Sequence, residues 1–146
     1  MKYAVLSGRI SYSLIFIMSG LNHFSQGTIA YAAAQGVPFA SIAVPLSGVM
    51  AILGGLSVAL GYRAKWGALM LVLFLLPVTA MMHNFWAVKD PMMALMQQAM
   101  FMKNLAILGG ALVISYFGAG PLSLDARERS RLARVRRLRT EQEVVA

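Results

Sequence analysis

Long runs of apolar residues, separated by short polar stretches, make up most of the first 120 residues of the chain. A helix that crosses the hydrocarbon core of a bilayer needs ~20 mainly apolar residues, with a range of ~17–25. Four runs meet this length, over about residues 3–24, 43–61, 66–83 and 99–117. The pattern predicts an all-α integral membrane protein whose residues 1–120 form a four-helix transmembrane bundle, followed by a basic tail over residues 121–146.

Small residues recur on the faces of these predicted helices. Ser47, Ala51, Gly55 and Ala59 follow one another every four residues in the second run, and small residues on one stripe let helix backbones approach closely in a membrane. Ser7, Ser11 and Ser19 mark a similar side of the first run, and Ala106 and Gly110 of the fourth. These stripes predict the seams of the bundle, and Pro77 predicts a kink in the third helix.

Two sequence echoes suggest an internal duplication. The pentapeptide Ala-Ile-Leu-Gly-Gly occurs at residues 51–55 and again at 106–110, and the first and third runs both end in a His/Asn/Phe group. Repeated helical hairpins are a known membrane architecture. The alternative is chance, because these residue types are common in membrane helices.

Composition and charge agree with a membrane protein. The chain is 59% hydrophobic and only 12% charged, whereas soluble domains are about 25% charged. Eleven basic residues fall on one side of the predicted membrane topology, and only Lys89 and Lys103 on the other. The positive-inside rule then places both termini in the cytoplasm and the loops at residues 25–42 and 84–98 outside. A cleaved signal peptide is the alternative interpretation of the first run, because residues 30–32 resemble a processing site.

The tail carries seven of the thirteen basic residues. We expect a helix here, started by a capping box from Asp125 to Glu128. Leu124, Leu132 and Val135 share a side with Leu138, so the helix is predicted to lie on the anionic inner leaflet or to bind an acidic partner subunit. A solvated tail is the third possibility, and binding of nucleic acid is not indicated. The candidate contact residues are the arginines Arg127, Arg129, Arg131, Arg134, Arg136, Arg137 and Arg139.

Candidate chemistry gathers at the predicted outer surface. The chain has two histidines, His23 after Asn22 and His83 before Asn84, and no cysteine, so thiolate chemistry and iron–sulfur ligation are excluded. Imidazole and amide groups beside Trp86 suit hydrogen bonding and proton transfer to a small ligand. The alternative is an interfacial belt that anchors the helix ends.

Lys103 is the strongest single candidate for a functional residue, because ionisable groups inside membrane segments are energetically costly and usually have partners. Asp90 is the one acidic residue before Asp125, so a Lys103–Asp90 ion pair is predicted, with snorkelling of Lys103 to the headgroups as the alternative. Met92, Met96 and Met100 share a stripe, and together with His83 they raise Cu(I) handling as a further possibility. Flexible packing of an apolar face is the favoured explanation of these methionines, and no metal site is predicted.

Five segments resemble the DoxX family, whose members are small four-helix bacterial membrane proteins. They are residues 19–22 (SGLN), 51–55 (AILGG), 83–86 (HNFW), 101–106 (FMKNLA) and 118–125 (GAGPLSLD). The resemblance covers about residues 5–125. It implies a location in the bacterial inner membrane and a relation to the DoxD subunit of a thiosulfate:quinone oxidoreductase, with members linked to redox and thiol-stress systems. His23 stands where a lysine is common in the family.

The resemblance implies a function for the polar residues at the predicted outer surface. We expect a small subunit associated with quinone-linked electron transfer, with no intrinsic cofactor. His83, Asn84, Trp86, Lys103 and Asn104 would form an outer quinone pocket, and His23 and Asn22 would lie opposite. The alternative is a non-catalytic assembly subunit in a larger membrane complex or a homo-oligomer.

Overall fold

The computed structural model describes residues 1–145, and this part of the chain is helical without any strand. Four of its helices are long and apolar enough to span a membrane: α1 (Lys2–Asn22), α3 (Ala40–Leu60), α4 (Ala64–Met82) and α5 (Pro91–Phe117). Three short or terminal helices complete the order, α2 (Gln26–Ala34), the 3-10 helix η1 (Phe85–Ala87) and α6 (Leu124–Val145). The predicted four-helix membrane fold is confirmed.

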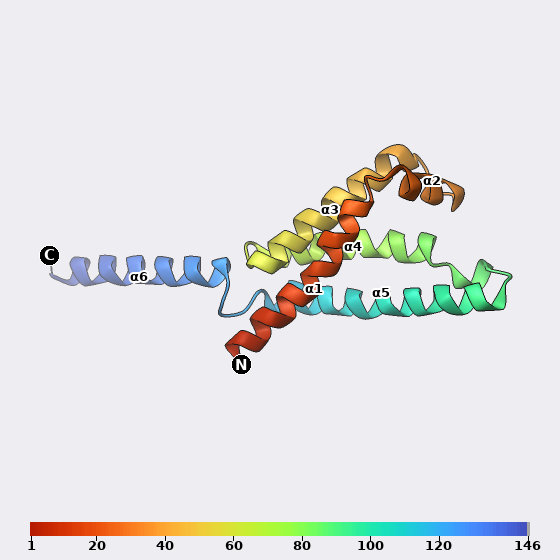
Figure 1. Ribbon diagram of the computed structural model, residues 1–146. Helices are drawn as coiled ribbons and strands as arrows, with labels where there is room; N and C mark the ends of the chain where they lie inside the picture. Colours follow the sequence, from red (N-terminus) through yellow and green to blue (C-terminus); the bar gives the residue numbers. More distant parts are fainter. Residues whose placement is uncertain (146) are drawn as a thin grey trace.

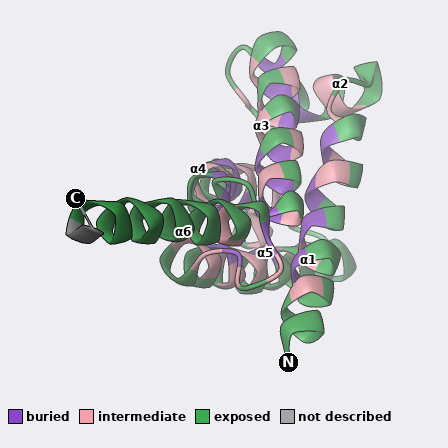
Figure 2. Cartoon of the chain, turned by 90° about the vertical axis from the view of Figure 1, so that its left-hand side faces the viewer, coloured by how far each residue is buried: buried purple, intermediate pink, exposed green. Residues whose placement is uncertain are grey.

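The helices pack in chain order, α1 against α3, α3 against α4, and α4 against α5 (Figure 1). This is the arrangement of two successive hairpins, with α2 inserted in the first and η1 in the second. The buried residues lie along the faces where α1, α3 and α4 meet, as the purple segments of Figure 2 show. The duplication of the hairpins stays a prediction.

The seam between α1 and α3 is built from backbone contact. A Cβ atom placed on Gly20 would lie 2.9 Å from the carbonyl oxygen of Gly48, and one on Gly48 would lie 2.8 Å from that of Gly20. Ala51 is fully buried beside them. The predicted small-residue stripe of α3 is therefore a packing seam. On α1, however, Ser7 and Ser11 are exposed, because the seam of that helix runs through Arg9, Ser13, Phe16 and Gly20 instead.

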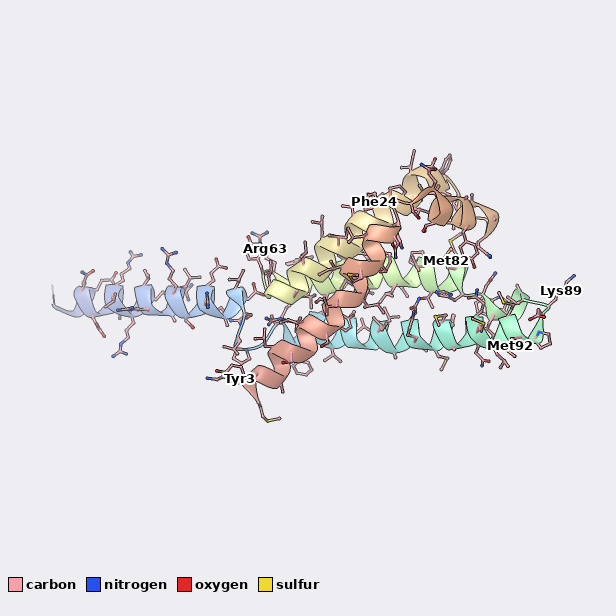
Figure 3. The ribbon with its side chains drawn as sticks, in the orientation of Figure 1. Tyr3, Phe24, Arg63, Met82, Lys89 and Met92 are labelled. Carbon is pink, nitrogen blue, oxygen red and sulfur yellow. The ribbon has the colours of Figure 1, made fainter. Side chains whose placement is uncertain are left out.

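The basic loop at residues 61–63 and the outer loops lie at opposite ends of the molecule. In Figure 3, Tyr3 and Arg63 mark one end, and Phe24, Met82, Lys89 and Met92 lie toward the other. We call these the inner and outer ends, following the predicted orientation of the chain.

The fourth membrane helix is longer than its hydropathy predicts. It begins at Pro91 rather than near residue 99, and its 27 residues span about 40 Å at 1.5 Å per residue. This exceeds the ~30 Å hydrocarbon core. The Asp90 carboxylate accepts a hydrogen bond from the backbone N–H of Met93 at 2.8 Å, and proline follows at the first helical position, so the start is a capped helix N-terminus.

A buried arginine joins the two ends of the chain at the inner side. Arg9 is only 6% exposed, and its guanidinium donates hydrogen bonds to the carbonyl oxygens of Ala59 (3.2 Å), Ala119 and Leu122 (2.8 Å). The Arg9 side chain therefore faces the bundle. These bonds hold the segment after α5 against the ends of α1 and α3.

The capping of the inner helices differs from the sequence prediction. The Asp125 carboxylate accepts hydrogen bonds from the backbone N–H groups of Arg63 (2.7 Å) and Ala64 (3.0 Å), so it caps α4. The hydroxyl of Ser123 caps α6 by accepting from the N–H of Ala126 at 3.1 Å. The predicted capping box from Asp125 was wrong, because the Asp125 carboxylate caps α4 and not its own helix. Helix α6 leads away from the bundle (Figures 1 and 2), and its attachment to a membrane surface or partner stays a prediction.

Candidate functional site

A small polar cavity lies on the outer half of the bundle. It has a volume of about 180 Å³ and is lined from three helices and their ends. Four of the seven predicted ligand residues line it, namely His23, His83, Lys103 and Asn104. Side chains that are far apart in the sequence are therefore brought to one place, and we call this space the polar cavity.

The shape of the bundle creates this cavity. Near the inner half, the Tyr12 hydroxyl of α1 donates to the carbonyl oxygen of Ile107 on α5 at 2.9 Å. Its ring lies against Gly110, where a Cβ would come within 2.9 Å. Further out, α1 runs obliquely across the bundle while α5 follows α4 (Figure 1). The polar cavity occupies the outer space between these helices, and Phe16 and Ile107 are among its apolar lining residues.

His23 follows the last residue of α1 and is held by α3. Its Nδ1 lies 2.9 Å from the hydroxyl oxygen of Ser47, while the Ser47 hydroxyl donates to the Val44 carbonyl at 2.7 Å. Because Ser47 has one proton to give, its oxygen must accept from Nδ1–H of His23. The ring also packs on Phe74, with 5.7 Å between centroids. Nε2 of the neutral imidazole is therefore an acceptor.

His83 is placed in the same way by the second hairpin. It ends α4, and its Nδ1 lies 2.8 Å from Oε1 of Gln97 on α5. An amide oxygen only accepts, so Nδ1 of His83 carries the proton and Nε2 of the neutral ring again accepts. The two histidines thus share one tautomer, fixed from outside the polar cavity.

The donors of the polar cavity come from α5. Lys103 is exposed, and its one polar contact among residues 1–145 is the sulfur of Met100, 3.5 Å from Nζ, which is a weak acceptor. Asn104 is 7% exposed, and within this described part its amide makes no side-chain hydrogen bond, although it lines the cavity. The lining contains no carboxylate, so the site carries the single formal charge of Lys103 when both imidazoles are neutral.

The structure does not bring Lys103 and Asp90 together as the predicted ion pair. Both belong to α5 or its cap, and 13 positions at 1.5 Å per residue separate them by about 20 Å along the helix. Asp90 is engaged in capping. The prediction assumed a later helix start, which would have left Asp90 in a loop free to fold back.

Three other predicted residues lie outside the cavity lining. Asn22 is exposed at the end of α1. Asn84 precedes η1 and accepts from the N–H of Ala87 with its backbone carbonyl, at 2.9 Å. Trp86 belongs to an aromatic cluster with Phe85 and Phe101, with centroid distances of 5.2–5.8 Å. This cluster attaches η1 to α5.

Sequence reasoning missed Ser47 and Gln97, the two residues that orient the histidines. Ser47 was grouped with small packing residues because it lies on a stripe with Ala51. Gln97 was assigned to a loop because the fourth helix was expected to begin at residue 99. The signal for Gln97 was present, since Asp90 followed by Pro91 is typical of a helix start.

The methionine stripe of α5 does not join the histidines in the polar cavity. Met92, Met96 and Met100 lie on an exposed stripe of α5, and no group of three or more His, Asp or Glu side chains suited to a metal ion occurs in residues 1–145. The polar cavity is lined by neither Met92 nor Met96. The geometry therefore offers hydrogen bonds and one cation rather than a methionine-rich ligand set.

Comparisons with known proteins add a family and two relatives. The DoxX family model matches residues 4–84. The inner membrane protein YqjF of Escherichia coli K12 is 32% identical over 123 residues, covering 83% of this chain and 88% of that protein. The ER-derived vesicles protein ERV29 of Saccharomyces cerevisiae is 32% identical over 81 residues, covering 56% of this chain but only 26% of that protein. No solved structure matches the chain significantly.

Proposed function

The chain belongs to the DoxX family, and on that premise we propose that it serves quinone-linked electron transfer in the bacterial cytoplasmic membrane by binding a quinone head group in the polar cavity. The observation that carries the proposal is the convergence of His23, His83, Lys103 and Asn104 on one cavity from α1, α4 and α5.

The size of the cavity supports a head group rather than a whole ligand. Sites for drug-sized molecules have volumes of ~300–1,000 Å³, whereas this one has about 180 Å³. A cavity of this volume can hold the quinone ring with its substituents. The apolar tail of the quinone would stay in the surrounding lipid.

The donors and acceptors of the site match both oxygens of such a ring. Lys103 and the Asn104 amide donate hydrogen bonds to carbonyl oxygens, and the charge of Lys103 stabilises negative charge that develops there. His23 and His83 present Nε2 lone pairs, which can take up or return the protons of ring hydroxyls. A bound quinone would supply the electron-accepting group, and the electrons must come from a partner or a diffusible donor.

A binding experiment with the full chain in lipid nanodiscs tests the proposal. The probe is a short-chain ubiquinol analogue that is kept reduced, because its ring hydroxyls can donate to Nε2 of His83 and its ring oxygens can accept from Lys103. Lys103→Met removes a charge-assisted hydrogen bond while keeping the length of the side chain, and should weaken binding at least about tenfold. Lys89→Met is the matched control, since Lys89 is the other outer lysine and is exposed away from the cavity.

His83→Ala should weaken binding in the same assay, and Trp86→Ala should not, because Trp86 lies outside the lining. Equal affinity in wild type, Lys103→Met and His83→Ala would reject the polar cavity as the quinone site. No binding by the wild type would reject the proposed function itself.

An assembly role is the second candidate, and helix α6 is the observation that favours it. The helix is exposed over residues 127–143. Among the described residues, only Arg137 and Arg139 of its seven arginines form ion pairs, with Glu141 and Glu143. The remaining charges are available to an acidic partner or to anionic lipids. Deleting residues 127–146 should release a bound partner and leave quinone binding intact if both proposals hold.

A further inference from the structure

A second cavity, apolar in character, lies on the outer half of the bundle. It has a volume of about 250 Å³ and is enclosed by α2, the outer half of α3 and the end of α4. Ala32, Val44, Pro77 and Met81 are among its lining residues. We call it the α2 cavity. His23 and Val78 line both cavities, so they form the wall between them.

The packing of α3 and α4 explains why this space exists. On their inner halves the two helices touch, because a Cβ on Gly54 would lie 2.7 Å from Leu71 and 3.1 Å from the Gly67 carbonyl oxygen. Toward the outer end they diverge, and α2 lies near the wider end (Figure 1). Pro77 lies within α4 on the cavity wall, where it removes a backbone hydrogen bond and favours a kink.

The lining of the α2 cavity favours an apolar occupant. Its polar side chains have partners in the protein, apart from Nε2 of His23 on the wall shared with the polar cavity. His23 and Ser47 bond each other, and the Thr28 hydroxyl bonds that of Ser25 at 2.8 Å. The rest of the lining is aliphatic, proline or thioether, and methionine adapts its shape to irregular apolar partners. Protein interiors rarely leave such a volume without contacting atoms, since the dispersion contacts of the lining are then lost.

The flanking aromatic residues indicate the depth of the cavity. Tyr31 on α2 and Phe39 at the start of α3 are exposed, by 47% and 84%. Phe39 has a φ of 50°, which is costly for a bulky residue. Aromatic side chains concentrate at the headgroup level of membranes. This places α2 at the outer headgroups and the cavity beneath it at the depth of lipid chains.

We propose that the α2 cavity binds a single hydrocarbon chain from the outer leaflet, with α2 as its cover. The chain can belong to a phospholipid or to an isoprenoid, because the lining recognises apolar length and not a headgroup. This proposal does not rest on quinone binding in the polar cavity.

Photolabelling of the full chain in nanodiscs tests the proposal. One sample contains a trace of phospholipid with a diazirine near the end of one acyl chain, and a second contains a prenyl chain with the same group. After illumination, peptide mass spectrometry locates the adducts. Labelling at residues 37–47 and 77–82 is expected to saturate with probe concentration, and to be competed by the unlabelled chain in the wild-type protein. The probe that labels these segments identifies the source of the chain.

Ala32→Leu fills the cavity from α2 and should reduce this labelling at least about tenfold. Ala106→Leu is the control, because it adds the same atoms at an exposed position of α5. Labelling of the lipid-exposed residues Leu73 and Leu76 should stay constant, and an unchanged circular dichroism spectrum shows that each variant is folded. Non-saturable labelling, equal at these exposed leucines and at the cavity segments, would overturn the proposal. Lys103→Met should leave the labelling unchanged, which separates this outcome from that of quinone binding.

Discussion

Adding one methyl group at Gly20 should destabilise the bundle, and the same addition at Gly8 should not. Both glycines lie within α1. An alanine Cβ at Gly20 would approach Ile52 to 2.7 Å, the backbone oxygen of Gly48 to 2.9 Å and Ala51 to 3.3 Å. Because one of these atoms belongs to the backbone of α3, the clash is not relieved by a side-chain rotation. At Gly8 no atom lies within 4 Å of the added Cβ.

The comparison of the two variants isolates the packing cost. Replacing glycine by alanine inside a helix gains about 0.5–1 kcal/mol from backbone propensity, and this gain is common to both positions. Overpacking costs about 1–3 kcal/mol and applies only at Gly20. Gly8→Ala should therefore equal or exceed the wild type, and Gly20→Ala should lie about 1–3 kcal/mol below Gly8→Ala.

Reversible unfolding in mixed micelles with increasing SDS, followed by circular dichroism, measures both variants against the wild type. Equal stability of Gly20→Ala and Gly8→Ala would refute the close approach of α1 and α3. A Gly48→Ala variant extends the test to the site, because its Cβ would come within 2.7 Å of the His23 Cβ atom. It should displace His23 and weaken ligand binding as well as packing.

Two further predictions concern the inner end, and the same unfolding assay measures both. Arg9→Leu removes three hydrogen bonds to backbone carbonyls and should cost about 3 kcal/mol. Arg129→Leu on exposed α6 should cost less than about 0.5 kcal/mol, and equal effects would contradict the stabilising role of the Arg9 hydrogen bonds. Asp125→Ala removes the cap of α4 and should cost about 1 kcal/mol, more than Glu128→Ala, and the reverse order would restore the capping box that the sequence predicted.

Much of the fold could be predicted from the sequence because a membrane imposes few solutions. Backbone groups in lipid must bond internally, so an apolar run of about 20 residues becomes a helix. The small-residue stripe through Ala51 and Gly55 predicted a seam because small residues let helix backbones approach closely in a membrane. The start of α5 was misplaced because Gln97 and Gln98 lower the local hydropathy, whereas the cap at Asp90 is a local signal that hydropathy does not measure.

The sequence predicted several residues of the candidate site, but not the contacts that position them. The positive-inside rule and the matching His/Asn ends placed His23 and His83 on one side. Nothing local in the sequence shows that Arg9 bonds carbonyls 110 and 113 residues away, or that Asp125 caps α4. Likewise, Ser47 orients His23 across the α1–α3 seam, and this contact depends on the crossing at Gly20 and Gly48. Such pairings follow from tertiary packing, which a periodic pattern does not encode.

Native mass spectrometry of the protein extracted gently from its own membranes tests most directly whether the polar cavity holds a quinone. Quinone extraction of the same sample identifies the bound species. The wild type and Lys89→Met should retain quinone, while Lys103→Met and His83→Ala should lose it with their folded mass and charge distribution unchanged. A stable protein partner with no retained quinone in the wild type would contradict quinone binding in the polar cavity and assign the chain to assembly.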